Sequence, residues 1–197
     1  MAGESNVTDR ERWNDRWRTA AASRDLFTPS SFLVSLAGLL PGPSRDYTPR
    51  ALDVAGGPGR NALWLAARGF DVTLVDVSSV ALELARNAAT AAGVSLTLVE
   101  TDLESAALPP GPFDLIVAID YLHRPLFPAF ATLLTRGGLL VYAQPTRRNL
   151  ERNPHPGARF LLDDGELPGL VPALEVVRYV ERWFDDRHEA RLIARRP

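Results

Sequence analysis

Short apolar runs alternate with helix-forming segments through the middle of this 197-residue sequence, and this alternation constrains the fold more than any other feature. The apolar runs are rich in branched residues and have the length of strands that are buried on both faces. Parallel strands joined by crossover helices produce this order, so we predict an α/β fold whose sheet is covered on both faces. The predicted strands are 51–55, 72–75, 96–99, 113–119 and 138–143, and the predicted helices are 60–68, 78–92 and 126–134.

A helix is also predicted at the N-terminus. Thr8 and Glu11 have the spacing of a capping box, and Trp13 and Trp17 fall on one face of a helix that we expect to end near Arg24. A face that carries two tryptophans must pack against a surface. That surface is either a ligand site, with the helix as its lid, or the helices that cover the sheet.

The remaining segments complete one domain. Residues 32–40 predict a second helix, which the following Pro-Gly-Pro ends. Residues 174–180 and 189–194 predict two strands of an antiparallel hairpin at one edge of the sheet. We predict a single domain, residues 1–197, with an N-terminal helical lid or cap at 1–45 and the sheet core at 46–197.

The composition excludes several kinds of chemistry. The chain has no Cys, so it has no disulfide and no thiolate nucleophile or metal ligand. It has no Lys either, because all 22 basic residues are Arg, and this excludes a Schiff-base lysine, a P-loop lysine and the Tyr-x-x-x-Lys pair of dehydrogenases. Genomic base composition alone can produce the same bias. Catalysis must therefore use other side chains or a cofactor.

Charge and hydropathy indicate no large partner. The formal net charge of −2 gives no sign of a nucleic acid or an acidic membrane. The polar segment 1–18 is unlike a secretory signal, and the apolar run 32–40 is too short to span a bilayer. His155 and His188 are isolated in the sequence, so no metal site is expected. We expect a cytoplasmic protein that binds neither nucleic acid nor membrane, and its oligomeric state is left open.

A glycine-rich turn follows the first predicted strand. The run 53–59 reads Asp-Val-Ala-Gly-Gly-Pro-Gly, and its glycines let the backbone turn tightly and let a ligand approach closely. Gly57-x-Gly59-x-x-Ala62 also fits the dinucleotide fingerprint. Asp76, 19 residues after Gly57, fits the ribose-binding acid of either a dinucleotide or a sulfur nucleoside.

Three acids distinguish these two cofactor classes. Asp53, Asp76 and Asp102 follow or end three neighbouring strands, at the edge where open α/β sheets bind ligands. An acid beside the turn would repel a pyrophosphate, whereas S-adenosylmethionine has no phosphate and carries an ammonium and a sulfonium. The pattern favours S-adenosylmethionine. The alternative is that these Asp residues are helix caps or turn formers.

The sequence resembles class I S-adenosylmethionine-dependent methyltransferases, in particular their bacterial tellurite-resistance and thiopurine-type branch. Residues 51–66 resemble motif I, residues 72–78 resemble motif II, and residues 113–118 and 136–142 resemble the fourth strand and the loop and strand that follow. The resemblance implies a Rossmann-like, seven-stranded, mostly parallel sheet with helices on both faces and an antiparallel last strand. It also implies S-adenosylmethionine as cofactor and S-adenosylhomocysteine (SAH) as product.

The resemblance assigns roles around the turn. Asp53 and the glycines would hold the methionine part, Asp76 the ribose and Asp102 the adenine amino group, with Leu103 beside the ring. Ala55 departs from the family, which often has Gly there, and it places a Cβ near the ligand. The expected cofactor-binding residues are Asp53, Ala55, Gly56, Gly57, Gly59, Asn61, Asp76, Val77, Asp102, Leu103 and Ala118.

Candidates for catalysis and acceptor binding follow the fourth strand. His123 is either a general base or a loop histidine that caps a helix or lies in solvent. Asp120 either orients the acceptor or only terminates the strand. Tyr121, Arg124 and Arg147 are the acceptor-binding candidates. A Pro-, Arg- and Asn-rich loop that either binds an anionic acceptor or is a solvated surface adds Arg148, Arg152 and Arg159.

The sequence therefore predicts methyl transfer from S-adenosylmethionine to a small-molecule acceptor. Two other functions fit the same fold. One is a nicotinamide-dependent oxidoreductase, and the other is an accessory protein that binds the cofactor without turnover.

Overall fold

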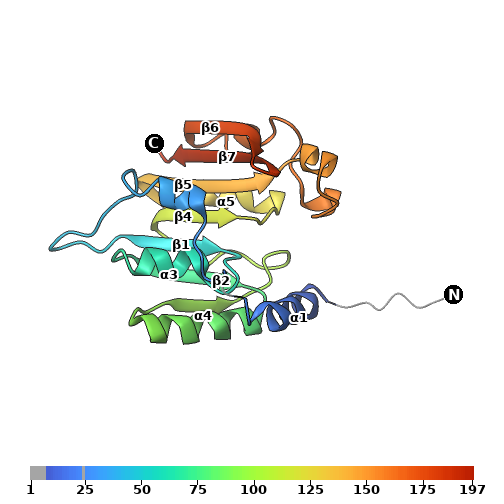
Figure 1. Cartoon of the computed structure of the whole chain (residues 1–197). Coiled ribbons are helices and arrows are strands. Elements are labelled where there is room, and N and C mark those ends of the chain that lie inside the picture. Colours follow the sequence, from blue (N-terminus) through green and yellow to red (C-terminus); the bar gives the residue numbers. More distant parts are fainter. Residues whose placement is uncertain (1–7, 24) are drawn as a thin grey trace.

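The computed structural model describes residues 8–23 and 25–197 and contains one seven-stranded sheet in the order β3-β2-β1-β4-β5-β7-β6 (Figure 1). The first five of these strands are parallel, and β7 runs antiparallel to both of its neighbours. The α/β fold class predicted from the sequence is confirmed, including the hairpin. The strands are β1 (Arg50–Val54), β2 (Asp71–Asp76), β3 (Thr97–Glu100), β4 (Phe113–Ile119), β5 (Leu134–Pro145), β6 (Glu175–Phe184) and β7 (Arg187–Arg195).

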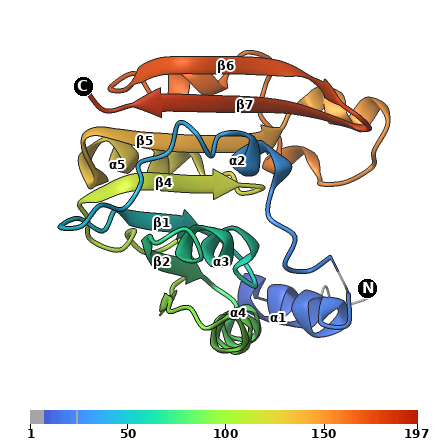
Figure 2. The same ribbon diagram turned by 60° about the vertical axis from the view of Figure 1, so that its left-hand side comes forward.

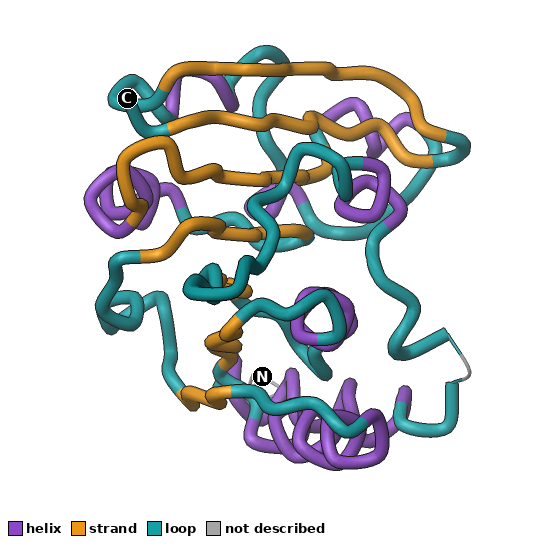
Figure 3. Tube along the Cα trace, turned by 90° about the vertical axis from the view of Figure 1, so that its left-hand side faces the viewer, coloured by secondary structure: helices purple, strands orange, loops and turns teal. Residues whose placement is uncertain are grey.

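Helices lie on both sides of this sheet (Figures 2 and 3). Two buried apolar clusters fill the space between the sheet and the helices. One includes Leu33 of α2, Leu65 of α3 and Leu82 of α4, and the other includes Phe130 of α5 and Leu167 of η4. The α-helices are α1 (Asp9–Ala20), α2 (Ser31–Ser35), α3 (Arg60–Ala66), α4 (Ser79–Ala92) and α5 (Phe127–Leu133), and the 3-10 helices are η1 (Arg124–Leu126), η2 (Arg147–Glu151), η3 (Ala158–Phe160) and η4 (Leu167–Leu170). None of the described helices is long and apolar enough to cross a bilayer.

The prediction for residues 32–40 is wrong in its extent. Helix α2 ends at Ser35, and the amides of Leu36, Ala37 and Leu39 then bond three residues back, as in tight turns. Gly38 lies in this stretch and has poor helix propensity, so the tighter turns replace a regular helix.

The N-terminal helix agrees with its sequence signal. Thr8 accepts a hydrogen bond from the Glu11 amide, and the Glu11 side chain accepts one from the Thr8 amide, as the capping box requires. The predicted end near Arg24 lies outside the described residues, and the described helix ends at Ala20. Figure 1 places α1 beyond the carboxyl ends of the parallel strands, which is the edge where the glycine turn lies.

Candidate functional site

The turn after β1 combines left-handed backbone with close packing. Ala55, Gly57 and Gly59 have φ angles of 50°, 57° and 85°. A Cβ at Gly56 would lie 2.2 Å from a Leu74 methyl, so only glycine fits there. Ala55 is the one non-glycine residue of the three in this conformation, which costs an L-residue roughly 1–2 kcal/mol. Alanine at position 55, where the resembling family often has glycine, therefore adds local backbone strain as well as a Cβ.

Two buried carboxylates hold this turn in place. Asp76, at the end of β2, accepts hydrogen bonds from the amides of Gly57 at 2.8 Å and Ser78 at 2.9 Å. Asp53, near the end of β1, accepts one from the Ala62 amide at 3.0 Å. Each acid therefore fixes a backbone segment that borders the candidate cofactor site.

Burial raises the pKa of both acids. It raises the pKa of Asp53 to about 7, against the opposing effects of the Ala62 hydrogen bond and the Arg60 charge. Burial also raises the pKa of Asp76, although amide hydrogen bonds from Ser78 and Gly57 oppose the rise. The crevice therefore becomes more negative as the pH rises through neutrality.

The third acid lies farther along the same edge. Asp102 is half-buried and accepts a hydrogen bond from the Glu104 amide at 3.0 Å, while Leu103 is buried in the core. Burial raises the pKa of the Tyr121 hydroxyl, and the negative charges of Glu104, Asp102 and Asp76 raise it further. The ends of β2, β3 and β4 thus bring an acidic rim and a neutral tyrosine together.

Helix α1 lies against this edge. Asn14 accepts a hydrogen bond from the Ser78 hydroxyl at 2.7 Å, and Arg10 pairs with Glu100 at the end of β3. A Cβ at Gly57 would lie 2.8 Å from Cζ2 of Trp17, so the indole covers the glycine turn. Among the described residues, the buried Nε1 of Trp17 has no hydrogen-bond partner. The indole thus places an unused donor next to the turn.

A pocket of about 420 Å³ lies between the segment before α2, the end of β4 and the β6–β7 turn. Asp120 lines it in a left-handed conformation, with φ 65°, and its carboxylate binds Arg60 at 2.9 Å and Arg187 at 2.5 Å. Arg187 and Arg191 both bind Glu189, at 3.1 and 2.9 Å. An ion-pair chain therefore links α3 to the hairpin across this pocket.

The remaining catalytic and acceptor-binding candidates are His123, Arg124 and Arg147, and the two arginines are already paired within the protein. His123 is half-buried at the N-cap position of η1 and makes no side-chain capping bond. Arg124 forms a two-point ion pair with Glu166, at 2.5 and 2.7 Å, and Arg147 pairs with Asp163. Glu166 and Asp163 thus hold the two arginines predicted to bind the acceptor.

The other three arginines predicted in this region also contact side chains of the protein, by an ion pair or by packing over an aromatic ring. Arg148 pairs with Glu151, Arg152 lies 3.9 Å from the centroid of Trp183, and Arg159 lies 4.3 Å from that of Phe160. His188 is buried and contacts Thr146 at 2.7 Å. In the part of the chain that the structure describes, no cluster of His, Asp and Glu could hold a metal ion.

Asn61, one of the expected cofactor-binding residues, accepts a hydrogen bond from the Ser30 amide at 3.0 Å and ties the N-terminal segment to α3.

Sequence reasoning missed residues of the pocket and of the β6–β7 hairpin. The pocket arginines Arg60, Arg187 and Arg191 were not singled out. The alternation of Arg178, Val180, Arg182 and Phe184 places all four on one face of a strand, and this signal was available in the sequence.

Residues 51–138 match the model of a protein family described as a methyltransferase domain. This stretch, somewhat less than half of the chain, is similar to a methyltransferase domain. The match runs from β1 through the glycine turn into β5, so it covers the carboxyl ends of β1 to β4 and none of the β6–β7 hairpin. It therefore concerns the cofactor half of the sheet.

Two curated relatives match the chain over part of their length. The release factor glutamine methyltransferase of Chlorobaculum tepidum is 46% identical over 78 residues, which is 36% of this chain and 26% of the relative. The ribosomal protein L11 methyltransferase of Thermus thermophilus is 37% identical over 115 residues, or 56% of this chain and 45% of the relative. The matches thus span less than half of either relative.

Solved structures match nearly the whole chain. A TehB-like S-adenosylmethionine-dependent methyltransferase from Corynebacterium glutamicum has a TM-score of 0.68 and 18% identity, covering 95% of this chain and 98% of that one. The magnesium protoporphyrin IX methyltransferase of Synechocystis, solved with bound SAH, has a TM-score of 0.64 and 17% identity, covering 99% and 90%. The chain shares the fold of these S-adenosylmethionine-dependent methyltransferases. Taken with the match of residues 51–138 to a methyltransferase domain, this fold indicates S-adenosylmethionine as the cofactor.

The residues present fit this cofactor. Glycine at position 57 leaves the backbone of the turn without a side chain, the Trp17 indole lies against it, and the Trp17 Nε1 lacks an acceptor among the described residues. Carboxylates border the turn, which suits a cation and disfavours a pyrophosphate. These features agree with the domain match.

The raised pKa of Asp53 generates a prediction about stability. Between about pH 4 and 7 the folded protein retains a proton on Asp53 that the unfolded chain has lost, so the free energy of unfolding falls as pH rises through this window. Asp53→Asn removes this dependence. We expect the variant to gain up to about 4 kcal/mol over the wild type from pH 4 to pH 7, at about 1.4 kcal/mol per pKa unit.

Urea denaturation at a series of pH values measures this difference. Asp71→Asn, at the exposed start of the neighbouring strand β2, is the control and should follow the wild type. Parallel curves for Asp53→Asn and the wild type would contradict the prediction.

Proposed function

We propose that this protein transfers a methyl group from S-adenosylmethionine to a small-molecule acceptor. The observation that carries this proposal is the glycine turn held by two buried carboxylates and covered by Trp17. Both curated relatives match only in part, so the activity of the chain is inferred from its own site as well as from its domain.

The cofactor supplies a methyl group on a sulfonium, which has a good leaving group. The protein then has to hold the two reactants in line and exclude water. The turn at Gly57 and the acid at Asp76 would hold the methionine and ribose parts, and Asp102 would face the adenine. Ala118 and Val77 would line the same edge.

The acceptor pocket is proposed to lie beside Asp120, where β4 and β5 end. Asp120 is held between Arg60 and Arg187, so it positions the pocket wall. Tyr121 and His123 follow Asp120 closely in the chain and are proposed to border the acceptor at this edge. His123 is retained as a candidate base for acceptors that lose a proton. Arg124 and Arg147 shape the surrounding loops through their ion pairs.

The N-terminal segment, within residues 1–45, is proposed to act as a lid. Helix α1 is held at the cofactor edge through Asn14 and Arg10, and Trp17 lies on the glycine turn. A ligand against Gly57 must therefore contact or displace this indole. Closure of the helix over the ligand would exclude water from the sulfonium.

Asp76 provides the first test. Asp76→Asn keeps one acceptor oxygen for the backbone but removes the charge that would bind the ribose hydroxyls. We expect calorimetry to show SAH binding at least tenfold weaker, since charge-assisted hydrogen bonds contribute roughly 1.5–3 kcal/mol each.

The control for this test is Asp71→Asn, which should bind SAH like the wild type. NADH should bind to neither the wild type nor the variants. NADH binding without a response to SAH would reject the proposed function.

Trp17 provides the second test. In a variant that keeps only this tryptophan, with the other three replaced by Phe, SAH should change the emission intensity or wavelength, because the indole lies on the turn that would hold the ligand. The matched control keeps only Trp64, which lies on α3 beside Arg68 and packs against the buried cluster between the sheet and α2 to α4. Unchanged Trp17 emission at saturating SAH would refute the lid.

A further inference from the structure

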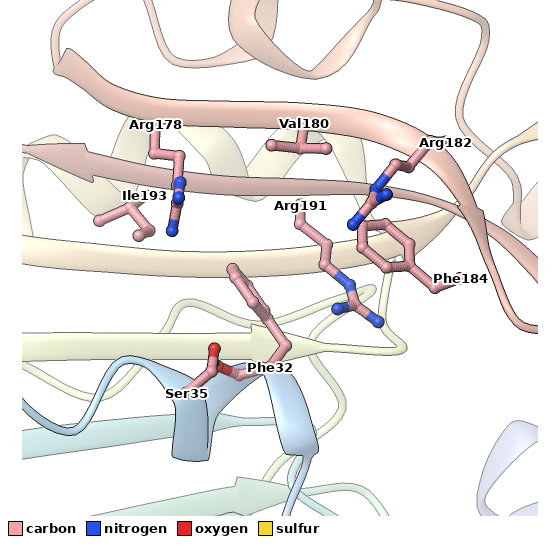
Figure 4. A pocket seen from close by; sticks show the side chains of 8 residues that line it. All are labelled: Phe32, Ser35, Arg178, Val180, Arg182, Phe184, Arg191 and Ile193. Carbon is pink, nitrogen blue, oxygen red and sulfur yellow. Dashed lines mark hydrogen bonds between the residues drawn. The ribbon is translucent and has the colours of Figure 1, made fainter.

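A second cavity, of about 240 Å³, lies between α2 and the face of the β6–β7 hairpin (Figure 4). Arg178, Arg182 and Arg191 extend into it from the two strands, and Phe32 extends toward it from α2. The register explains the cluster, because Val180 pairs with Arg191 and Arg178 with Ile193. These residues alternate along the strands and so share one face. The complete lining is Phe32, Ser35, Arg178, Val180, Arg182, Phe184, Arg191 and Ile193.

The positive charge in this cavity is not neutralised. Arg191 pairs with Glu189, but no carboxylate of residues 8–23 or 25–197 forms an ion pair with Arg178 or Arg182. The lining itself contains no acid. The larger pocket differs, since its arginines are paired with Asp120 and Glu189. The charge of this cavity thus remains available to an anion.

Aromatic rings hold the guanidinium groups of Arg182 and Arg191 in position. Phe184 lies between Arg191, at 3.5 Å from its ring centroid, and Arg182, at 4.7 Å. Arg191 also lies 5.3 Å from the centroid of Phe32. Stacked guanidinium groups keep their edges free for hydrogen bonds to planar or tetrahedral oxyanions. The cavity therefore combines apolar walls with oriented donors.

The cavity adjoins the proposed acceptor pocket. Phe184 and Arg191 line both, and Arg191 lies opposite Ala143, which lines the larger pocket at the end of β5. A molecule that reaches from one to the other would have one end at Asp120 and the other among the arginines.

Charged residues on β6 also have a simpler explanation, because β6 is an edge strand and charges protect such edges. Edge protection requires no cavity and no stacking on aromatic rings. Figure 4 shows the three guanidinium groups on the side of the sheet that faces α2. The cavity and the two guanidinium groups beside Phe184 therefore go beyond what edge protection requires.

We propose that this cavity binds the carboxylate or phosphate of the methyl acceptor, so that the substrate is a small oxyanion with an apolar body. This inference rests on the proposed function for the identity of the ligand, whereas the anion site itself can be tested without it.

The test uses the full chain and simple probes. Phenyl phosphate and benzoate supply the two oxyanions, and benzyl alcohol is the neutral counterpart. Calorimetry at constant ionic strength compares the wild type with the double variant Arg178→Gln/Arg182→Gln. The control is Arg195→Gln, two residues beyond Ile193 on β7 and outside the lining. SAH is titrated into each protein in parallel. If the double variant has a lower melting temperature than the wild type, the single variants Arg178→Gln and Arg182→Gln replace it.

We expect saturable binding of at least one anion and none of benzyl alcohol, with a loss of tenfold or more in the double variant and no change in Arg195→Gln. Arg178→Lys/Arg182→Lys should restore only part of the affinity, because lysine keeps the charge and loses the two-point geometry. Equal affinity in wild type and double variant, or no anion binding by the wild type, would overturn the inference. A wild type that binds the anions but not SAH would overturn the proposed function instead, and with it the assignment of the anion as acceptor.

Discussion

The hydrogen bond from the Gly57 amide to the Asp76 carboxylate joins the turn after β1 to the end of β2, and the geometry of the candidate site depends on it. The same carboxylate accepts the Ser78 amide, so one buried acid fixes both the turn and the start of α4. A buried carboxylate is unfavourable unless amides or a cation satisfy it. The Gly57 amide thus stabilises the buried carboxylate of Asp76, and a cationic ligand at this edge would stabilise it further.

The same constraint accounts for the position of α1. Asp76 binds the backbone amides of Ser78 and Gly57. Helix α1 contacts the same two residues, through Asn14 on Ser78 and Trp17 on Gly57. The helix has no buried residues of its own, so a few contacts along this edge determine where it lies. An element attached in this way can open at low energetic cost, because little apolar surface is exposed when it leaves.

The fold could be predicted because strand alternation and caps are local signals. β4 and α4 lie within one or two residues of their predicted bounds, and the capping box at Thr8 forms as its spacing requires. Contacts between distant segments left no such signal. The pairing of Arg124 with Glu166, of Asn61 with Ser30 and of Arg60 with Asp120 each joins residues at least 31 positions apart. The sequence could therefore indicate which edge of the sheet binds a ligand, but not which of its polar side chains are already engaged within the protein.

Charge is distributed unevenly along this edge, and the distribution bears on how two reactants could be oriented. Acids surround the ends of β1 to β3, where a cationic cofactor would lie. Arg178 and Arg182, which form no ion pair with a carboxylate of the described residues, lie beyond β5 on the hairpin. In the proposed complex each reactant would be attracted to its own half of the sheet by charge sign and excluded from the other. Their reacting ends would then meet at the boundary near Asp120, where carboxylates and arginines pair with one another. Since methyl transfer depends mainly on alignment, this separation of charge would supply orientation without a dedicated catalytic base.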